Sequence, residues 1–365
     1  MFLASLSVLN YKNIVQADLA FSPKINCFIG PNGEGKTNLL DAIYYLSFCH
    51  SATTPTDAQV VRHGEESMAI HGVYKSDDGE DEVISAGIAP GRRKRFSRNR
   101  KPYRRLAEHI GLVPLVMISP QDNVLVTGGG EERRKFMDTV ISQYDNIYLD
   151  SLIKYNRALQ QRNALLRGEE EPDASILGVF EEIMAFEGER IFAKRSDFIE
   201  RLTPIFRNYY SLISNDKEEV ELAYTSHCMR GPLLEVIQRD RAKDRIMGYS
   251  LHGIHRDELE MRLGGYPIRR EGSQGQAKSF LVALKFAQFE LLKHVGKQTV
   301  PLLLLDDLFD KLDAGRVAQI VELVAGDDFG QIFITDTNRD HLDSILAATQ
   351  GDYRLFKVKN GEVSE

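Results

Sequence analysis

One stretch of eight residues has the residue types and spacing of a phosphate-binding loop. It matches the pattern G-x-x-x-x-G-K-[ST] and comprises Gly30, Pro31, Asn32, Gly33, Glu34, Gly35, Lys36 and Thr37. Backbone N–H groups of such a loop, and of the helix that follows it, cradle phosphates. We expect Lys36 to reach the β- and γ-phosphates and the Thr37 hydroxyl to bind Mg²⁺, a cation that prefers oxygen. The expected cofactors are therefore ATP and Mg²⁺, and a chance glycine loop is the weaker alternative.

An acidic pair follows an apolar run much later in the chain. Four leucines, residues 302–305, lead directly into Asp306 and Asp307. A continuous apolar run is typical of a buried strand in a parallel sheet, so both carboxylates are expected at its carboxyl end, beside the loop. Asp306 would hold Mg²⁺, usually through water, and Asp307 would be a general base or would orient the attacking water. The alternative is a pair of solvated turn carboxylates.

A second anion-binding feature lies at the start of a predicted helix. Its residues are Ser273, Gln274, Gly275 and Gln276. A helix N-terminus that carries a serine and a glycine attracts phosphate. One chain does not need two such cradles for a single γ-phosphate, whereas two copies arranged head to tail do. We therefore predict a homodimer in which Lys36 and Asp307 of one copy and Ser273 of the other act on one ATP; an ordinary helix cap is the alternative.

A basic stretch without acidic residues occupies residues 92–105. Nine of its residues are Lys or Arg, although the whole chain has a net charge of −7. Exposed charges act over about 8–10 Å at physiological salt, so the local excess matters more than the net charge. Such residues would neutralise DNA phosphates without reading sequence, but a solvated β-hairpin explains the stretch equally well. The candidate DNA contacts are Arg92, Arg93, Lys94, Arg95, Arg98, Arg100 and Lys101.

Composition indicates an ordinary globular chain. Of its 365 residues, 42% are hydrophobic and 27% are charged, a balance that excludes a disordered chain. The three cysteines are scattered without metal-binding spacing, which fits a reducing compartment. No apolar run approaches the roughly 18 residues that span a bilayer, and the N-terminus lacks the basic start of a signal peptide. We expect a cytoplasmic protein and exclude the secreted, fibrous and membrane-spanning classes.

The order of predicted elements indicates an α/β fold with an inserted helical lobe. Apolar runs predict strands at 25–29, 113–118, 300–305, 331–335 and 353–358, and helical spacing predicts helices at 37–48, 131–167, 174–214, 276–294 and 316–324. Pro172 and Asp173 suit a helix boundary. Strands that alternate with helices argue for a mostly parallel sheet. We therefore predict an ATP-binding α/β lobe from residues 1–120 and 220–365, and a helical lobe at residues 121–219.

The order of these motifs resembles that of a known family. A phosphate-binding loop, a helical insertion, a signature serine, an acidic strand and a D-loop follow one another in the ABC-type ATPase heads of the SMC kind. The match covers essentially the whole chain, and the short helical lobe is similar to that of the bacterial members that serve DNA replication and repair. It rests on residues 10–13, 30–40, 119–122, 132–138, 161–163, 255–257, 273–276 and 305–313. The resemblance implies a P-loop ABC-type ATPase head with a mixed α/β lobe I and a mostly α lobe II.

The resemblance also implies roles for residues outside the loop. The implied nucleotide contacts are Lys12, Asn13, Gln121, Ser273, Gly275, Gln276 and Asp313. Gln121 stands at the Q-loop position, where it would also contact the metal. Ser273 would act in trans as the signature serine. Asp313, at the end of the D-loop sequence 310–313, would face across the dimer.

Three departures from the general ABC pattern affect the expected activity. Asp307 replaces the usual catalytic glutamate and is one methylene shorter. No histidine follows the strand at 331–335, where Thr335 and the next two residues stand, and Gln274 occupies a position where many ABC proteins have glycine. The first two departures favour a slow ATPase. His255 is a weaker candidate for a catalytic role.

The resemblance further implies how ATP would be used. Its binding would close a homodimer on double-stranded DNA near junctions with single-stranded DNA, and slow, DNA-stimulated hydrolysis would release the DNA. Mediator proteins of the RecR and RecO type are the implied partners, and no membrane is expected. Two rivals stay open: a nucleotide-switched DNA scaffold without hydrolysis, and a P-loop kinase of a small molecule, which would need neither the signature nor the D-loop.

Overall fold

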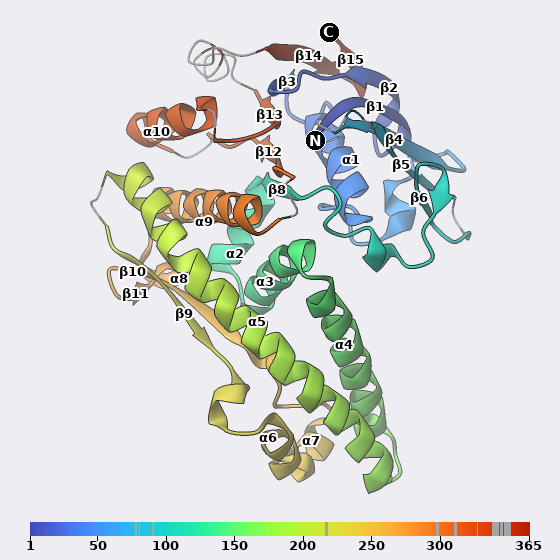
Figure 1. Cartoon of the computed structure of the whole chain (residues 1–365), viewed down its shortest axis with the longest axis vertical. Helices are drawn as coiled ribbons and strands as arrows, with labels where there is room; N and C mark the ends of the chain where they lie inside the picture. The colour runs from blue at the N-terminus through green and yellow to red at the C-terminus, as the bar shows by residue number, and fades with distance from the viewer. Residues whose placement is uncertain are drawn as a thin grey trace. The chain divides into compact units, whose positions relative to one another are not determined.

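The computed structural model divides into two compact units (Figure 1). The first unit comprises Met1–Asn123, Leu212–Ser214 and Gln274–Glu365, and the second unit comprises Val124–Ser211 and Asn215–Ser273. The structure describes residues 1–365 except 77, 78, 80, 90, 216, 217, 297, 298, 310, 311, 327, 338–342, 344, 345 and 347–351.

A mostly parallel sheet of the first unit has the strand order β15-β14-β3-β13-β12-β8. Its strands are β3 (Ile25–Ile29), β8 (Leu115–Ile118), β12 (Leu302–Asp306), β13 (Ile332–Asp336), β14 (Tyr353–Lys359) and β15 (Glu362–Ser364). β15 is antiparallel to β14, and the other pairs are parallel. β12 and β13 are buried throughout, as their continuous apolar sequences predict. The parallel arrangement brings the carboxyl ends of β3, β12 and β13 to one edge of the sheet.

The N-terminal strands form a separate antiparallel sheet with the order β2-β1-β4-β5-β6-β7. These strands are β1 (Phe2–Tyr11), β2 (Ile14–Ala20), β4 (Met68–Lys75), β5 (Asp81–Ile88), β6 (Arg95–Arg98) and β7 (Lys101–Pro102). Helix α1 (Lys36–Phe48) packs against strands of both sheets. One hydrophobic core therefore joins the two sheets, with Phe28, Phe333 and Phe356 from the parallel sheet in it.

Two further helices belong to the first unit. Helix α9 (Gln274–Val295) is buried over most of its length and packs against β8. Helix α10 (Ala314–Ala325) begins after Asp313, whose side chain caps it. Among the described residues, no helix combines the length and the apolar character that crossing a membrane requires.

The second unit consists of helices and a small antiparallel sheet. Its helices are α2 (Asn123–Thr127), α3 (Gly130–Tyr144), α4 (Asn146–Arg167), α5 (Ala174–Ser214), α6 (Leu233–Arg239), α7 (Arg241–Met247) and α8 (Ile268–Glu271), and its strands are β9 (Val220–Thr225), β10 (Glu258–Leu263) and β11 (Tyr266–Pro267). The first residue of α2 and the last three residues of α5 are counted with the first unit. The predicted helix over 174–214 is confirmed, with Asp173 as its N-cap. The single helix predicted over 131–167 is wrong. Asp145 interrupts it in an extended conformation and caps α4 by accepting from the N–H groups of Ile147 and Tyr148.

The end of the helical lobe, predicted at residue 219, differs from the structure, in which the second unit continues to Ser273. A buried ion-pair network accounts for the difference. Arg195 of α5 donates to Asp138 of α3 and to Asp257, each at 2.8 Å. A buried charge that loses its partners is costly, so this network holds the segment before β10 against the long helices.

A second buried network acts in the same way. Arg162 of α4 is fully buried and donates to Asp244 of α7 and to Ser250 Oγ, each at 2.7 Å. Its Nη2 atom also lies 3.0 Å from Glu181 of α5. Segments that read as α/β in the sequence thus belong to the helical unit, because their charged residues pair with its helices.

Candidate nucleotide-binding site

The predicted phosphate-binding loop connects β3 to α1. A Cβ atom at Gly30 would lie 2.2 Å from the carbonyl oxygen of Val358, so no larger residue fits there. Gly35 has a φ of +115°, and a Cβ atom there would lie 2.8 Å from the Asn13 side chain. Gly30 is therefore required by the close approach of the β14 backbone, and Gly35 by the turn that precedes α1.

Lys36 points back into the loop. Its side chain is buried, and Nζ donates to the carbonyl oxygens of Gly30 at 2.7 Å and Pro31 at 3.0 Å. A buried ammonium group needs such acceptors. Phosphate oxygens are stronger acceptors than carbonyl oxygens because they are charged. The position of Lys36 therefore fits a group that binds the terminal phosphates of a nucleotide.

The predicted metal ligands Thr37 and Asp306 lie side by side. Thr37 Oγ1 donates to both carboxylate oxygens of Asp306 at 3.0 Å. Burial raises the pKa of Asp306 above its ordinary value. Hydrogen bonds from Thr335 and Thr37 and the charge of Lys36 partly oppose this increase. A hydroxyl beside a buried carboxylate is a set of hard oxygen donors of the kind that Mg²⁺ prefers. The two residues therefore fit the ion that the sequence predicts.

Thr335, at the carboxyl end of β13, connects the two acidic residues. Its Oγ1 donates to Asp306 Oδ1 at 2.6 Å and lies 3.2 Å from the backbone nitrogen of Asp307, which donates to it. Asp307 has a φ of 44°, in the left-handed region that few residues other than glycine adopt. Thr335 was noted in the sequence only as standing where a histidine is expected. In the sequence, this role is indicated by a hydroxyl residue near the carboxyl end of the strand that pairs with the Asp306 strand.

Asn13 braces the loop from the turn between β1 and β2. Its Nδ2 donates to the carbonyl oxygen of Glu34 at 3.1 Å, and its Oδ1 accepts from Asn38 Nδ2 at 2.7 Å. The backbone nitrogen of Gly361 donates to the same Glu34 oxygen at 2.9 Å. Asn13 therefore fixes the loop, and Asn38 is a supporting residue that the sequence prediction missed.

Lys12 makes several contacts within the protein itself. Its side chain is 11% exposed, and Nζ donates to the buried carboxylate of Asp41 and to Ser51 Oγ, the latter at 3.2 Å. Tyr11 donates to the same carboxylate at 2.6 Å. The charge of Lys12 therefore balances that of the buried Asp41 carboxylate.

A cavity of about 600 Å³ opens beside the loop. Its lining includes Lys12, Asn13, Gly33, Arg62, His63 and Asn360. Because Gly33 belongs to the loop, this cavity adjoins the predicted phosphate site. The predicted contacts Lys12 and Asn13 both line it.

Gln121 follows β8 in a short 3₁₀ helix, Pro120–Asp122, and is exposed. β8 pairs with β12 in parallel, with Ile118 opposite Leu305. Gln121 and Asp306 therefore follow neighbouring strands at the same edge of the sheet. The next residue, Asp122, is fixed by an ion pair with Lys285 of α9 at 2.7 Å.

The signature residues and the D-loop residue Asp313 are connected through Arg316. Arg316 Nη1 donates to Ser279 Oγ at 2.8 Å, and that hydroxyl donates to the carbonyl oxygen of Gly275 in the first turn of α9 at 2.9 Å. Arg316 Nε lies 3.3 Å from Asp313 Oδ2. Ser273 is exposed just before this turn. Two further residues of the D-loop sequence, 310 and 311, lie outside the described residues.

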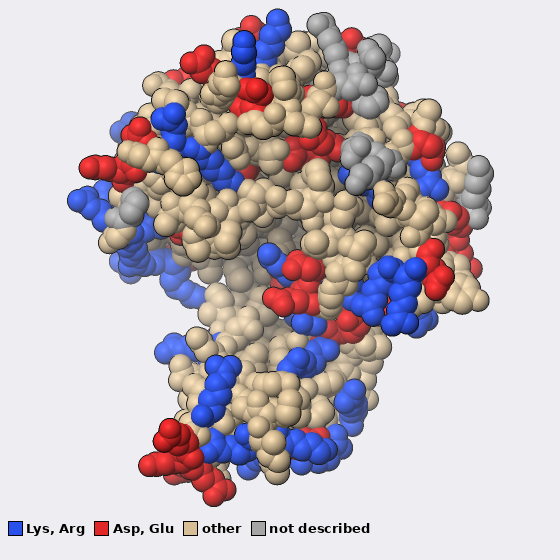
Figure 2. All heavy atoms as spheres, turned by 180° about the vertical axis from the view of Figure 1, so that it is seen from behind, with Lys and Arg blue, Asp and Glu red and all other residues tan. Residues whose placement is uncertain are grey.

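The predicted DNA-binding stretch forms β6, β7 and the turn between them, at the edge of the antiparallel sheet. Figure 2 shows Lys and Arg side chains gathered where this edge lies in that view. Two of the seven candidates are occupied by carboxylates of the first unit. Lys94 Nζ lies 2.8 Å from Asp57 Oδ2, and Arg98 forms a two-point ion pair with Glu82. The candidates that the structure leaves exposed without these pairs are Arg92, Arg93, Arg95, Arg100 and Lys101.

Both ring nitrogens of His255 contact residues of the second unit. Its Nδ1 lies 2.8 Å from the Tyr155 hydroxyl and its Nε2 lies 3.0 Å from the carbonyl oxygen of Ser250. Burial lowers the pKa of His255 to about 4. Both ring nitrogens therefore serve the packing of the second unit.

The geometry defines a class of protein. A phosphate-binding loop follows the strand β3, and Asp306 ends β12 at the same sheet edge. The N-terminal strands form a separate antiparallel sheet. A helical unit is inserted between these elements and the signature helix α9. This is the fold of the ABC-type ATPase heads, as the sequence predicts.

Comparison with known proteins narrows the class. Residues 2–364 match the family described as RecF/RecN/SMC N terminal domain. The chain is 60% identical to the DNA replication and repair protein RecF of Phocaeicola vulgatus over 365 residues, which are 100% of this chain and 98% of the relative. It is 50% identical to RecF of Porphyromonas gingivalis over 364 residues, with 100% of both chains covered. The chain therefore belongs to the RecF/RecN/SMC N-terminal domain family and, within it, to the RecF proteins.

Solved structures agree with this assignment. Two structures of the recombination mediator protein RecF in the RecFOR pathway, described as RecF-ATP and RecF-ATPrS, have a TM-score of 0.88 and 29% identity to this chain, covering 100% of it and 97% of the solved chains. An SMC head bound to the C-winged helix domain of ScpA has a TM-score of 0.61 at 14% identity and covers 100% of this chain and 96% of its own. The SMC head shares the fold alone.

Proposed function

We propose that this chain is an ATP-dependent DNA-binding protein of recombinational repair and replication. ATP and Mg²⁺ bind at Gly30–Thr37 and Asp306, and binding closes a homodimer on double-stranded DNA near junctions with single-stranded DNA. Slow hydrolysis then releases the DNA. The RecF relatives, among them the structure described as RecF-ATP, support the use of ATP in repair.

The observation that carries the proposal is the connection of the signature turn to Asp313. Arg316 contacts Asp313 at 3.3 Å and, through Ser279, the first turn of α9. Two segments far apart in the sequence are therefore connected into one block. The side chain of Asp313 is 66% exposed, and Ser273 is exposed as well. A block that presents a helix N-terminus and a carboxylate together is suited to complete the phosphate site of a second copy.

Shared ATP explains why a dimer would depend on the nucleotide. A ligand shifts an equilibrium only by its difference in affinity between the two states. ATP that contacts Lys36 in one copy and Ser273 in the other gains contacts that the monomer does not offer. ADP lacks the γ-phosphate that would reach Ser273 and is expected to favour the monomer.

We propose mediator proteins of the RecR and RecO type and DNA as the partners of this chain. The solved RecF structures are described as a recombination mediator in the RecFOR pathway, which supports mediator proteins of the RecR and RecO type. DNA contact is assigned to the exposed edge at β6 and β7. This edge carries basic residues that form no ion pair with the described carboxylates of the first unit. A cytoplasmic location is consistent with this role.

Sedimentation velocity tests the dimer directly. The wild-type chain is measured without nucleotide, with ADP–Mg²⁺ and with ATP–Mg²⁺, each with and without a junction DNA. We expect a monomer in the first two conditions, a dimer with ATP, and a further increase in sedimentation when the junction is added. A monomer in the presence of saturating ATP and DNA contradicts the proposal.

Removal of exposed basic residues tests the DNA contact. Replacing Arg92, Arg93 and Arg95 with Gln is expected to weaken DNA binding and to lower the slope of log K against log salt by up to about 2.7, since each lost phosphate contact removes about 0.9. Fluorescence anisotropy with a labelled junction at several salt concentrations measures both values. The matched control removes three exposed charges elsewhere, at Lys75, Arg239 and Lys243. Equal slopes for both variants would show that the edge at β6 and β7 does not contact DNA.

A further inference from the structure

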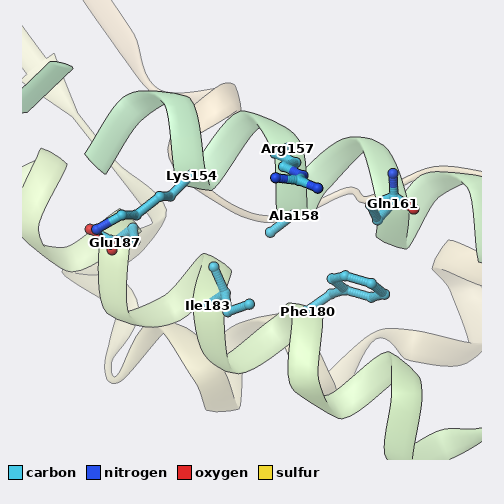
Figure 3. Close-up of a pocket in the computed structure, with 7 residues that line it drawn as sticks. All are labelled: Lys154, Arg157, Ala158, Gln161, Phe180, Ile183 and Glu187. Atoms are coloured by element: carbon cyan, nitrogen blue, oxygen red, sulfur yellow. Dashed lines mark ion pairs between the residues drawn. The ribbon is translucent and has the colours of Figure 1, made fainter. Parts of the chain in front are cut away.

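A groove lies between the helices α4 and α5 of the second unit (Figure 3). It encloses a cavity of about 580 Å³, lined from α4 by Lys154, Arg157 and Ala158 and from α5 by Phe180, Ile183 and Glu187. In Figure 3, Phe180 and Ile183 point toward α4, and Lys154 extends across the groove to Glu187. The floor of the groove is therefore apolar, and its rim is charged.

The apolar floor continues as an exposed stripe along α5. Ile176, Val179, Ile183 and Phe186 are 49%, 55%, 37% and 63% exposed. Their spacing of three, four and three residues places them on one face of the helix, over about 15 Å. The opposite face supplies the core of the second unit with buried residues such as Leu177 and Met184. The stripe is therefore not needed for the internal packing of the helix, and a contiguous exposed apolar surface is typical of an interaction site.

The charged rim is basic. Glu187 is almost fully buried and lies 3.4 Å from both Lys154 and Arg190, so two cations surround one carboxylate. Arg190 also lies over the ring of Phe186, at 5.5 Å from its centroid. Arg157 adds a further exposed positive charge on the α4 side. The groove thus combines an apolar floor with three basic residues, while the exposed carboxylate of Glu182, three residues after Val179 and four before Phe186, flanks the stripe on its other side.

We propose that this groove binds an amphipathic helix of a partner protein, with apolar residues on one face and acidic residues beside them. A helix of three to four turns matches the length of the stripe, and insertion of its apolar side chains between two helices is a common mode of peptide recognition. Acidic residues on its flank pair with Arg157 and Arg190. This surface lies entirely within the second unit and acts independently of the ATP site.

Charge argues against a second copy of this chain as the occupant. In a two-fold symmetric interface the same patch meets itself. The basic residues Lys154, Arg157 and Arg190 of two copies would then lie close together, and like charges across an interface are unfavourable. An acidic helix satisfies both the apolar stripe and the basic rim.

The test uses the full-length chain without nucleotide and a synthetic, fluorescein-labelled helical peptide of about 15 residues, roughly four turns. The peptide carries leucines at three- and four-residue spacing and glutamates on both flanks; a second peptide has lysines in place of the glutamates. Anisotropy titrations are expected to show saturable binding of the acidic peptide and at least about tenfold weaker binding of the lysine peptide. The Ile183→Ser and Phe186→Ser variants are each expected to weaken binding of the acidic peptide about tenfold.

A charge reversal and a matched control complete the design. Arg157→Glu is expected to weaken the acidic peptide and to strengthen the lysine peptide. Ile246→Ser, at a residue of α7 that is 84% exposed, is expected to change neither affinity. Absence of saturable binding, equal affinity for both peptides, or unchanged affinity in the Ile183 and Phe186 variants overturns the proposal. So does a nucleotide-free dimer that Phe186→Ser converts to a monomer, because a second copy then covers the face.

Discussion

Replacement of Lys36 by methionine is expected to lower the affinity for ATP by about 100-fold or more and to abolish the ATP-dependent dimer. Lys36 donates to carbonyl oxygens of its own loop at 2.7 and 3.0 Å, and we expect a bound nucleotide to replace these acceptors with phosphate oxygens. A hydrogen bond to a charged group contributes about 1.5–3 kcal/mol, so the loss of two of them corresponds to about 100-fold in affinity or more. Methionine keeps the length of the side chain and removes its charge.

Two measurements separate the loss of affinity from damage to the fold. Equilibrium binding of a fluorescent ATP analogue reports the affinity, and sedimentation velocity with ATP reports the dimer. Lys75→Met, at an exposed residue of β4, is the matched control and is expected to leave both values unchanged. If Lys36→Met still dimerises with ATP as the wild type does, the proposal that two copies share one ATP is contradicted.

The fold class follows from local sequence patterns. The apolar runs at 25–29 and 302–305 are the strands β3 and β12 because a strand covered on both faces needs apolar residues on both. The loop at 30–37 begins directly after β3 because its glycines meet the demands of the backbone turn there. Residues that are close in sequence determine these features, so the sequence alone predicts them.

Features that depend on distant residues could not be predicted. The extent of the second unit is set by Arg162 and Arg195, whose carboxylate partners include Asp244 and Asp257, far away along the chain. The arginine pattern in the sequence does not reveal these partners. Lys94 is likewise a basic residue of the predicted DNA-binding stretch, yet it pairs with Asp57. Charge can be read from a sequence, but the partner of a charge depends on the tertiary fold.

The roles of Thr335 and Arg316 were missed for the same reason. Thr335 is a common residue at a strand end, and its importance arises only because parallel pairing places it beside Asp306 and Asp307. Arg316 is the third residue after a helix cap, and only the packing of α10 brings it to Ser279. In both cases a residue of ordinary type gains a role from an adjacent element.

Replacement of Asp307 by asparagine is expected to slow ATP hydrolysis by about 100-fold or more, the usual contribution of a positioned general base. ATP binding and dimer formation are expected to persist, because Asp307 does not belong to the loop and the predicted metal ligands Thr37 and Asp306 are unchanged. Asparagine suits the experiment because it tolerates a positive φ better than most residues, and Asp307 has a φ of 44°. The substitution therefore removes the negative charge while the hydrogen bond from residue 307 to Thr335 is retained.

The same variant distinguishes a clamp that hydrolyses ATP from a scaffold that only binds it. Single-turnover release of phosphate measures hydrolysis, and the lifetime of the ATP-bound dimer on a junction DNA measures release. A clamp timed by hydrolysis predicts that Asp307→Asn slows both processes together, whereas Asp352→Asn, at an exposed residue before β14, changes neither. If hydrolysis in Asp307→Asn equals that of the wild type, Asp307 is not the base. If hydrolysis falls but the dimer dissociates at the wild-type rate, nucleotide exchange sets the lifetime, and the scaffold explains the function better than the clamp.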